Sequence, residues 1–342
     1  MSEETKVRTV FTGVSPNQLV CDTTLRAMPD GTWALFFLGG GDTEPCPANA
    51  IFVCRSADRG ETWSAPELVD LGVKRANPST AVVPTEISVI GGRCTLWLAT
   101  HRGGFRGWET WFCHSEDSGR TWGALQPAPG FLCQRSFLRK MLVLRDGRLL
   151  LAYQHYPDVG PDDPVTLGPQ NGVLESCDGG ATWSIHGAIR HPDPAHYGWE
   201  ENSIVELSDG RVAMLMRADG DGCLRQAIAE DGGRTWPAQS SATAIPNPGS
   251  KLTLYGGGGG PIGLVHNPTS QAPRTPLALW TSHDDMQTWS ERRILVPASQ
   301  DGADKALNYP DGFLTPDGTL HIAIDDNRRH AVYVRTSLAT LG

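Results

Sequence analysis

The chain has 342 residues and a formal net charge of −9, and it contains 39 glycines and 25 prolines. The negative charge argues against nucleic acid as a partner. No apolar run approaches the roughly 18 residues of a membrane-spanning helix, so we expect no membrane partner either. The polar segment from Met1 to Lys6 lacks the pattern of a secretory signal, so we expect a cytoplasmic location, or secretion if a signal has been removed.

The first part of the chain alternates short apolar runs with turn residues, which is typical of β-strands. Residues 1–14 are predicted to supply a closing strand, and residues 19–37, turning at Pro29-Asp30-Gly31, a first hairpin. A glycine-rich loop at 39–45 then leads into a strand at 50–54.

Comparable units follow to the end of the chain, with no linker and no shift in composition. They are expected around residues 74–108, 139–156, 199–217, 256–274 and 308–335. The glycine run at 256–260 is followed by neither a helix nor Gly-Lys-Ser/Thr, which disfavours a phosphate-binding loop. We therefore predict a single domain, residues 1–342.

One eight-residue pattern, [S/A]-x-D-x-G-x-T-W, recurs every 53 to 61 residues. Its copies lie at 56–63, 115–122, 176–183, 229–236 and 282–289, the last with Met286 in place of glycine. A repeat of this length indicates stacked or radially arranged units. The Asp is expected to accept hydrogen bonds from nearby backbone N–H groups and the Gly to adopt a positive φ, while the Trp packs between units. We interpret the pattern as a hairpin scaffold.

These copies resemble the Asp boxes of sialidase-type (neuraminidase-like) proteins. The resemblance implies an all-β fold, a six-bladed β-propeller with five recognisable Asp boxes, closed by pairing the two ends of the chain in one blade. The innermost strands of a propeller line its axial channel. Polar residues near the start of successive blades should therefore converge at one mouth, namely Asp22, Arg75, Arg139 or Lys140, Glu201, Lys251 and Tyr309.

Three later segments are similar to the functional segments of sialidases. Glu201 followed by Val-Glu-Leu, Arg217 and a box implies a glutamate that activates a tyrosine and an arginine that binds a carboxylate. The segment 266–274 implies a second such arginine, Arg274, and Asn308-Tyr309-Pro310 implies the nucleophile Tyr309. The segment 74–78 adds Arg75 as a further ligand contact.

The implied chemistry is consistent with these residue types. A neutral tyrosine can approach an anomeric centre beside a substrate carboxylate without repulsion, and a nearby glutamate can take its proton. Arginine forks hold carboxylates through charge-assisted bonds.

Two positions depart from the sialidase pattern. Cys21 stands where the family carries its first arginine. The general acid should precede the strand at 50–54, where counting back reaches Cys46, with Asp42 and Glu44 nearby; we take Asp42 as the candidate acid.

The leading hypothesis is an exo-acting, retaining glycoside hydrolase that releases a terminal, acidic sugar from a glycan. One alternative is a polysaccharide lyase or non-sialic glycosidase acting on uronates, in which His101 or His155, which end strands beside loops, could transfer protons and contact substrate. Another is a non-catalytic carbohydrate-binding propeller.

Metal and cofactor sites are not expected. The eight cysteines are scattered without metal-type spacing, and we interpret them as small buried residues of a reducing compartment. The oligomeric state is left open.

Overall fold

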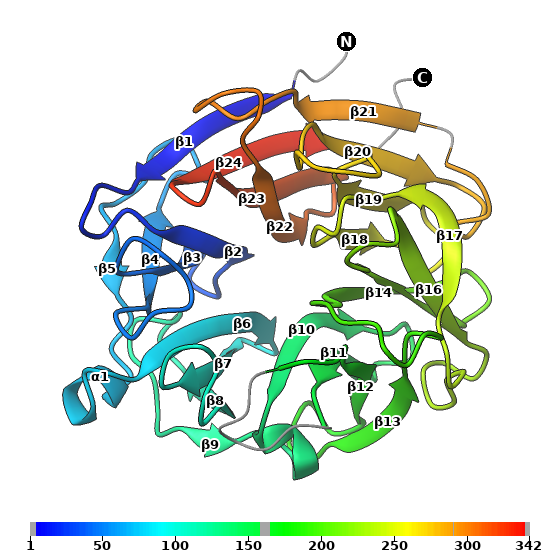
Figure 1. The fold of residues 1–342 in the computed structure, drawn as a ribbon, viewed down its shortest axis with the longest axis horizontal. Coiled ribbons are helices and arrows are strands. Elements are labelled where there is room, and N and C mark those ends of the chain that lie inside the picture. The colour runs from blue at the N-terminus through cyan, green and yellow to red at the C-terminus, as the bar shows by residue number, and fades with distance from the viewer. Residues whose placement is uncertain (1–4, 158–164, 290, 339–342) are drawn as a thin grey trace.

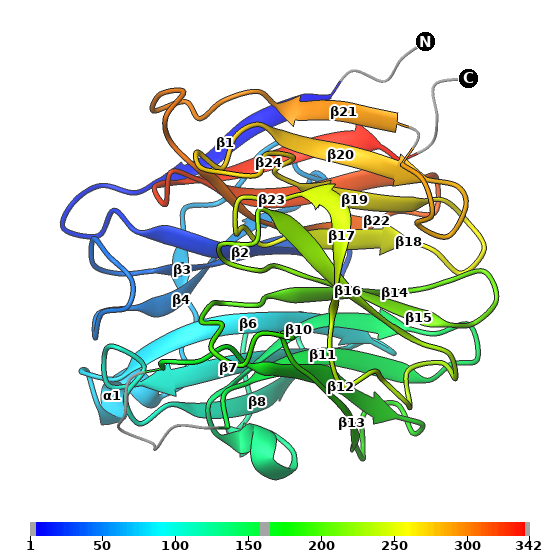
Figure 2. The ribbon, with the colours of Figure 1, turned by 45° about the vertical axis from the view of Figure 1, so that its right-hand side comes forward.

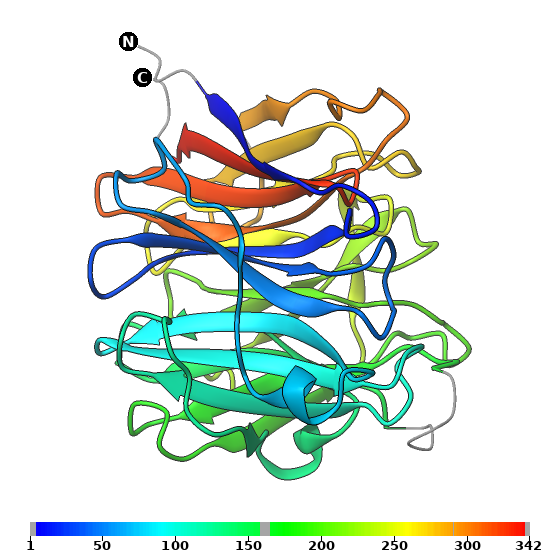
Figure 3. The same cartoon turned by 90° about the vertical axis from the view of Figure 1, so that its left-hand side faces the viewer.

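Six four-stranded antiparallel sheets surround a common axis in the computed structural model, which describes residues 5–157, 165–289 and 291–338 (Figure 1). The strand order in the sheets is β2-β3-β4-β5, β6-β7-β8-β9, β10-β11-β12-β13, β14-β15-β16-β17, β18-β19-β20-β21 and β22-β23-β24-β1. The predicted six-bladed propeller is confirmed. The first strand of each of these lists faces the axis, and the side views show the sheets edge-on (Figures 2 and 3).

The strands and two short helices have the following bounds. They are β1 (Lys6–Thr12), β2 (Val20–Ala27), β3 (Trp33–Gly39), β4 (Ala50–Ser56), β5 (Glu67–Leu68), α1 (Val73–Ala76), β6 (Ala81–Ile90), β7 (Arg93–His101), β8 (Glu109–Ser115), β9 (Gln126–Pro127), a 3-10 turn (Gly130–Cys133), β10 (Ser136–Val143), β11 (Leu149–His155), β12 (Gln170–Ser176), β13 (Ser184–Ile189), β14 (Asn202–Glu206), β15 (Val212–Met216), β16 (Cys223–Ala229), β17 (Ser241–Pro246), β18 (Thr253–Gly256), β19 (Ile262–His266), β20 (Leu277–Ser282), β21 (Glu291–Val296), β22 (Leu307–Leu314), β23 (Thr319–Asp326) and β24 (His330–Ser337).

The two ends of the chain close the ring. Strand β1 pairs antiparallel with β24, with Lys6 opposite Arg335 and Thr12 opposite His330. The sequence-based expectation of a closing strand in residues 1–14 is thus confirmed. Pairing within one blade ties the ends of the ring together, so the six innermost strands keep fixed positions around the channel.

The apolar core lies between neighbouring blades. For example, Leu279 of β20 packs in one buried cluster with Ile322 of β23, and Ile51 of β4 packs in another with Leu96 of β7. Because the inner part of each sheet is covered on both faces, strands such as β3 and β15 are buried along their whole length, whereas the outermost strand β1 is largely exposed. No helical segment in the described part of the chain combines the length and the apolar character needed to span a bilayer.

The Asp boxes join strands at the outside of the blades. In the second box, Asp117 Oδ1 accepts from the backbone N–H of Thr121 at 2.9 Å, and Thr121 Oγ1 donates to Oδ2 at 2.6 Å. Gly119 has φ 72°, and in the fifth box Met286 adopts φ 66°. The boxes shape the hairpins and lie away from the channel, as a scaffold role requires.

The cysteines follow the expectation only in part. Cys21, Cys54, Cys94 and Cys113 are buried, whereas Cys177 is exposed because it lies inside a box, on the turn itself.

Candidate functional site

A pocket of about 290 Å³ opens at one end of the axial channel. It is lined by Asp22, Glu44, Pro45, Phe105, Phe137, Arg139, Trp199, Glu201, Arg217, Arg274, Tyr309 and Arg328. Some of these residues lie on the innermost strands β2, β10 and β22, or directly before the innermost strand β14. The others lie in loops that follow the second strand of a blade. Among the described residues, the lining carries four arginines and three carboxylates.

Tyr309 lies on β22 where the pairing of β22 with β23 shifts register between Asn308 and Asp311. Its φ is 52°, an uncommon value for a bulky residue that occurs mainly where the surrounding structure imposes it. The Oγ1 of Thr23 donates to the Tyr309 carbonyl at 3.1 Å. Burial, and then the charge of Glu201, raise the pKa of Tyr309 well above its usual value, so the phenol is protonated at neutral pH.

Glu201 directly precedes β14 and is 3% exposed. Its Oε2 accepts from Arg217 Nη1 at 2.8 Å, and its Oε1 lies 3.9 Å from Arg139 Nη2. Burial alone would raise the pKa of Glu201, but Arg217, Arg139, Arg274 and Lys251 outweigh it and lower the pKa below its usual value. Glu201 is therefore ionised beside a neutral tyrosine.

Arg217 and Arg274 are held by neighbouring groups. Asp219 accepts from Arg217 Nε at 2.8 Å and from Nη2 at 3.0 Å, and the same carboxylate accepts from the Trp199 N–H. Arg274 donates to Asn308 Oδ1 at 3.0 Å and to a backbone carbonyl, that of Gly249, at 2.7 Å. Both guanidinium groups are thereby fixed in orientation at the pocket lining.

Asp22 lies on β2 beside Cys21, the position where the family carries its first arginine. The Asp22 carboxylate is 3.7 Å from Arg139 Nη1 and 3.7 Å from Lys251 Nζ. Lys251 Nζ also lies 5.6 Å from the ring centroid of Tyr309. Cys21 is fully buried, and Arg139 and Lys251 are the cations paired with Asp22 among the described side chains.

Glu44 enters the pocket from the loop between β3 and β4. Its Oε2 is 3.3 Å from Arg328 Nη1 and accepts from Cys21 Sγ at 3.4 Å. Burial and the charge of Asp22 raise the pKa of Glu44 to about 7, against the opposing effect of Arg328. A carboxyl with this pKa can both donate and accept a proton near neutral pH.

One wall of the pocket is aromatic. Trp199 and Phe105 have ring centroids 5.1 Å apart, and Phe137 lies 5.8 Å from Phe105. Trp108 and Tyr156 are buried behind them in the same cluster. This wall offers an apolar face opposite the charged residues, as pockets for sugars and other ring-shaped ligands often do.

The structure brings together most of the predicted site. Tyr309, Glu201, Arg217, Arg274, Asp22 and Arg139 line the pocket, and Lys251 contacts two of them. Lys140, the alternative to Arg139, lines a different cavity at the opposite end of the channel.

Four predicted residues, Asp42, Arg75, His101 and His155, lie outside the pocket lining. Asp42 is exposed and accepts from Ser15 Oγ and the Gln18 N–H, because the loop turns it outward. Arg75 lies in the outlying helix α1, pairs with Asp70 and is largely exposed. Neither residue lines the pocket, whereas Asp42 was expected to be the general acid and Arg75 a ligand contact.

The two histidines are buried behind the site. His101 Nδ1 accepts from the Gly103 N–H at 3.0 Å, and its ring lies 4.5 Å from Phe105. His155 Nδ1 and Ser136 Oγ are 2.8 Å apart. Neither histidine is in the pocket lining, so neither is placed to contact a ligand there, although His101 packs on Phe105 of the wall.

Glu44, Arg328 and Trp199 were not among the predicted site residues. Glu44 lies only two residues from Asp42, but loop geometry decides which of the two carboxylates points inward. Arg328 occupies the turn between β23 and β24 with φ 53°, a place that no sequence motif marks.

Two groups of side chains bring potential metal ligands within 4.8 Å of one another in the described residues. The group of Cys21, Asp22 and Glu44 lies in this pocket, where Arg328 and Lys251 already balance its charge. The group of His191, His196 and Asp221 lies outside the pocket lining.

Known proteins resemble this chain in both sequence and fold. A family model described as BNR repeat-like domain matches residues 84–322. The chain is 26% identical over 356 residues to a sialidase of Micromonospora viridifaciens, covering 93% of this chain and 51% of that protein. It is 24% identical over 289 residues to a sialidase of Bacteroides fragilis (strain YCH46), covering 72% of this chain and 49% of that protein.

The fold is similar to that of the Hadza microbial sialidase Hz136, with a TM-score of 0.74 at 19% identity, covering 94% of this chain and 66% of that one. The chain spans about half the length of the two curated sialidases that it matches.

Proposed function

The chain belongs to the BNR repeat-like domain family, and on this premise we propose that it is an exo-acting, retaining glycoside hydrolase that releases a terminal acidic sugar. The observation that carries the proposal is the pairing of a neutral Tyr309 with an ionised Glu201 in a pocket lined by Arg217 and Arg274. The relatives named sialidases support a sugar acid as the substrate class.

The charge balance of the pocket favours an anionic substrate. Within the lining, four arginines face three carboxylates, one of which, Glu44, has a pKa of about 7. Lys251 beside Asp22 and Asp219 beside Arg217 add one charge of each sign. A substrate carboxylate can therefore enter without leaving a net negative site, and the arginine forks can bind it through charge-assisted hydrogen bonds.

The reaction that fits this arrangement has two steps. In the first, Tyr309 Oη attacks the anomeric carbon and passes its proton to Glu201, while Glu44 donates a proton to the leaving-group oxygen. In the second, Glu44 takes a proton from water and the water oxygen attacks the anomeric carbon. The bond from that carbon to Tyr309 Oη breaks, and Tyr309 regains its proton from Glu201. Two displacements on the same carbon give net retention.

The test is a time course on a panel of aryl glycosides that includes sialic acid, uronates and neutral sugars. Wild type is compared with Tyr309→Phe and with the matched control Tyr255→Phe, which changes a tyrosine at the other end of the channel. We expect aglycone release from an acidic sugar, lost by roughly 10³-fold or more in Tyr309→Phe and retained in Tyr255→Phe.

Equal release by both variants would contradict the tyrosine mechanism. Absorbance from an unsaturated product would instead indicate a lyase, and binding without turnover a carbohydrate-binding propeller.

A further inference from the structure

A second cluster of polar side chains lies behind the wall of the pocket, on the outer side of the segment 191–201. Glu201 faces the pocket, whereas its neighbour Glu200 lines a separate hollow of about 500 Å³ together with His191 and His196. Consecutive residues of an extended segment point to opposite sides, so one short stretch serves both places.

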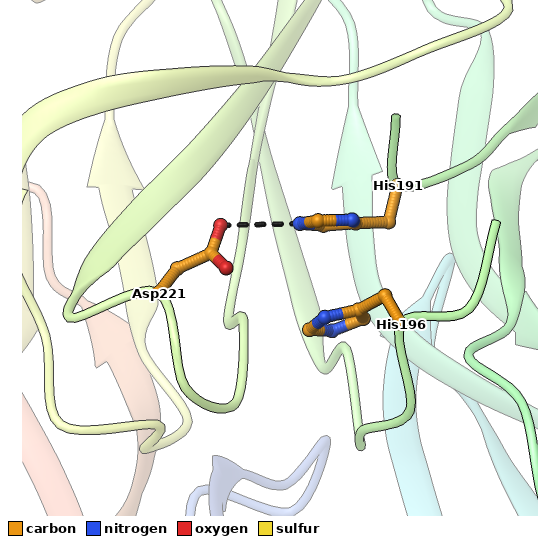
Figure 4. A group of neighbouring side chains, drawn as sticks. All are labelled: His191, His196 and Asp221. Carbon is orange, nitrogen blue, oxygen red and sulfur yellow. Dashed lines mark hydrogen bonds and ion pairs between the residues drawn. The ribbon is translucent and has the colours of Figure 1, made fainter. Parts of the chain in front are cut away.

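The imidazole rings of His191 and His196 and the carboxylate of Asp221 lie side by side (Figure 4). The rings of His191 and His196 are stacked, with centroids 3.9 Å apart and planes inclined by 17°. His191 Nε2 lies 3.1 Å from Asp221 Oδ2. One nitrogen from each histidine and one oxygen of Asp221 all lie within 4.8 Å of one another, close enough for one metal ion to reach all three after small side-chain rotations.

Glu200 supplies an independent observation. It is 2% exposed, and its Oε2 accepts from Asn171 Nδ2 at 2.8 Å, but Oε1 has no hydrogen-bond partner. That oxygen lies 3.6 Å from His196 Nε2, which also has no hydrogen-bond partner. The two atoms face each other beyond hydrogen-bond distance, so a cation that binds both would satisfy two buried polar groups at once.

We propose that His191, His196 and Asp221 bind one divalent transition-metal ion of the zinc class. Glu200 lies outside the group of atoms within 4.8 Å of one another, and a rotation of its side chain makes it the fourth ligand. Two imidazoles and two carboxylates are the donors that Zn²⁺ accepts in tetrahedral sites, whereas Ca²⁺ and Mg²⁺ prefer oxygen ligands alone. The ion would bind the two partnerless atoms and lie between segments that are separate in sequence.

Two existing contacts must be accommodated. The backbone N–H of Asp193 donates to His191 Nδ1 at 3.1 Å, which leaves the proton of neutral His191 on Nε2, directed at Asp221. Metal binding through Nε2 moves that proton to Nδ1 and gives up the Asp193 bond, which water can replace because Asp193 is exposed. Arg225 Nη1 donates to Asp221 Oδ2 at 2.7 Å and keeps this carboxylate oriented.

The site is linked to the catalytic pocket through the backbone. Asp219, two residues before Asp221, binds Arg217 and the Trp199 N–H, and Trp199 adjoins Glu200. An ion that ties the two segments together is therefore expected to stabilise the pocket wall as well as the cluster itself.

The experiment measures Zn²⁺ binding by the chelator-treated protein, using equilibrium dialysis and metal analysis. We expect one Zn²⁺ per chain and a rise in melting temperature on its addition. His196→Gln should weaken Zn²⁺ binding by at least about 10-fold. The matched control is His114→Gln, at a half-buried histidine of β8 that hydrogen-bonds Thr95, and it should bind Zn²⁺ as wild type does.

A second readout uses wild type alone and does not depend on whether a variant folds. Co²⁺ in place of Zn²⁺ should give visible absorption bands of a four-coordinate site without a thiolate charge-transfer band. Absence of bound Zn²⁺, equal affinity in His196→Gln and Asp221→Asn, or a thiolate band that places the ion on cysteine would each overturn the proposal.

Discussion

The two ends of the axial channel are built by the same six innermost strands, yet they differ in how their charges are balanced. At the proposed catalytic end, the lining carries four arginines and three carboxylates, and Lys251 and Asp219 add one charge of each sign beside it. At the opposite end, in a cavity of about 500 Å³, Arg26 donates to Asp311 and Glu86 at 2.7 Å each, and Lys140 is the further cation among the described lining residues.

The difference shows that a buried charged cluster is not by itself a ligand site. Arg26 uses its Nε and both Nη atoms on protein acceptors, including the Ile87 carbonyl, so its contacts serve the packing of blades one, two and six. Arg217 and Arg274 are also anchored, but they line a pocket in which cations remain in excess. The first arrangement favours a stable fold and the second favours an anionic ligand.

The largest expected effect comes from replacing one carboxylate by the matching amide at each end of the channel. Glu201→Gln removes the group that accepts the Tyr309 proton, so kcat should fall by about 10²–10⁴-fold. Glu86→Gln changes a carboxylate at the opposite end and should leave kcat unchanged. Steady-state kinetics of both variants on the same aryl glycoside measure the two values of kcat. Similar losses of kcat in the two variants would contradict a special role for Glu201.

Arg26→Met should lower the stability of the fold and leave kcat unchanged. It leaves Asp311 and Glu86 buried without their cation, which costs about 3–5 kcal/mol in the free energy of unfolding. Denaturant unfolding measures this loss, and kinetics on the folded fraction should give the wild-type kcat. A variant as stable as wild type would show that this cluster does not hold the blades together.

Arg274→Met should discriminate between substrates. Loss of a charge-assisted hydrogen bond of about 1.5–3 kcal/mol lowers kcat/KM for an acidic sugar by roughly 10- to 150-fold, whereas a neutral analogue should be unaffected. Arg292→Met, at an arginine of the same blade that lies over the Trp280 ring, is the matched control. Equal losses on acidic and neutral sugars would indicate a purely structural role for Arg274.

The smallest effect is a pH dependence. Because the pKa of Glu44 is about 7, the protonated form that donates to the leaving group is lost as pH rises above about 7. We expect kcat/KM to fall by up to about tenfold per pH unit above that value. In Glu44→Gln this alkaline limb should disappear, with the greatest loss of rate on substrates that have poor leaving groups. A limb that persists in the variant would assign it to another residue.

The fold could be predicted because its signal is local. In the second Asp box, for example, Ser115, Asp117 and Thr121 make the turn within eight residues, so the pattern reports a hydrogen-bonded structure directly. The spacing of the boxes then fixes the size of the blades.

Repeat geometry could place residues on or directly before an innermost strand, such as Tyr309 and Glu201, and the resemblance to sialidase segments pointed to Arg217 and Arg274. The segment before β6 instead forms helix α1 and carries Arg75 outward. Gly40 and Gly41, with positive φ, break the strand alternation before Asp42 and Glu44, so spacing cannot tell which carboxylate points inward. His191 and Asp221 are thirty residues apart and meet only because two loops are adjacent.

The central claim is that Tyr309 carries the sugar during turnover. The most direct measurement is mass spectrometry of the protein after reaction with a fluorinated sugar acid that forms the glycosyl-enzyme quickly and releases it slowly. We predict one added sugar per chain, located on the tryptic peptide that contains Tyr309 and absent in Tyr309→Phe. A protein that turns over the substrate but never acquires the label, or that carries it on another residue, would contradict the account.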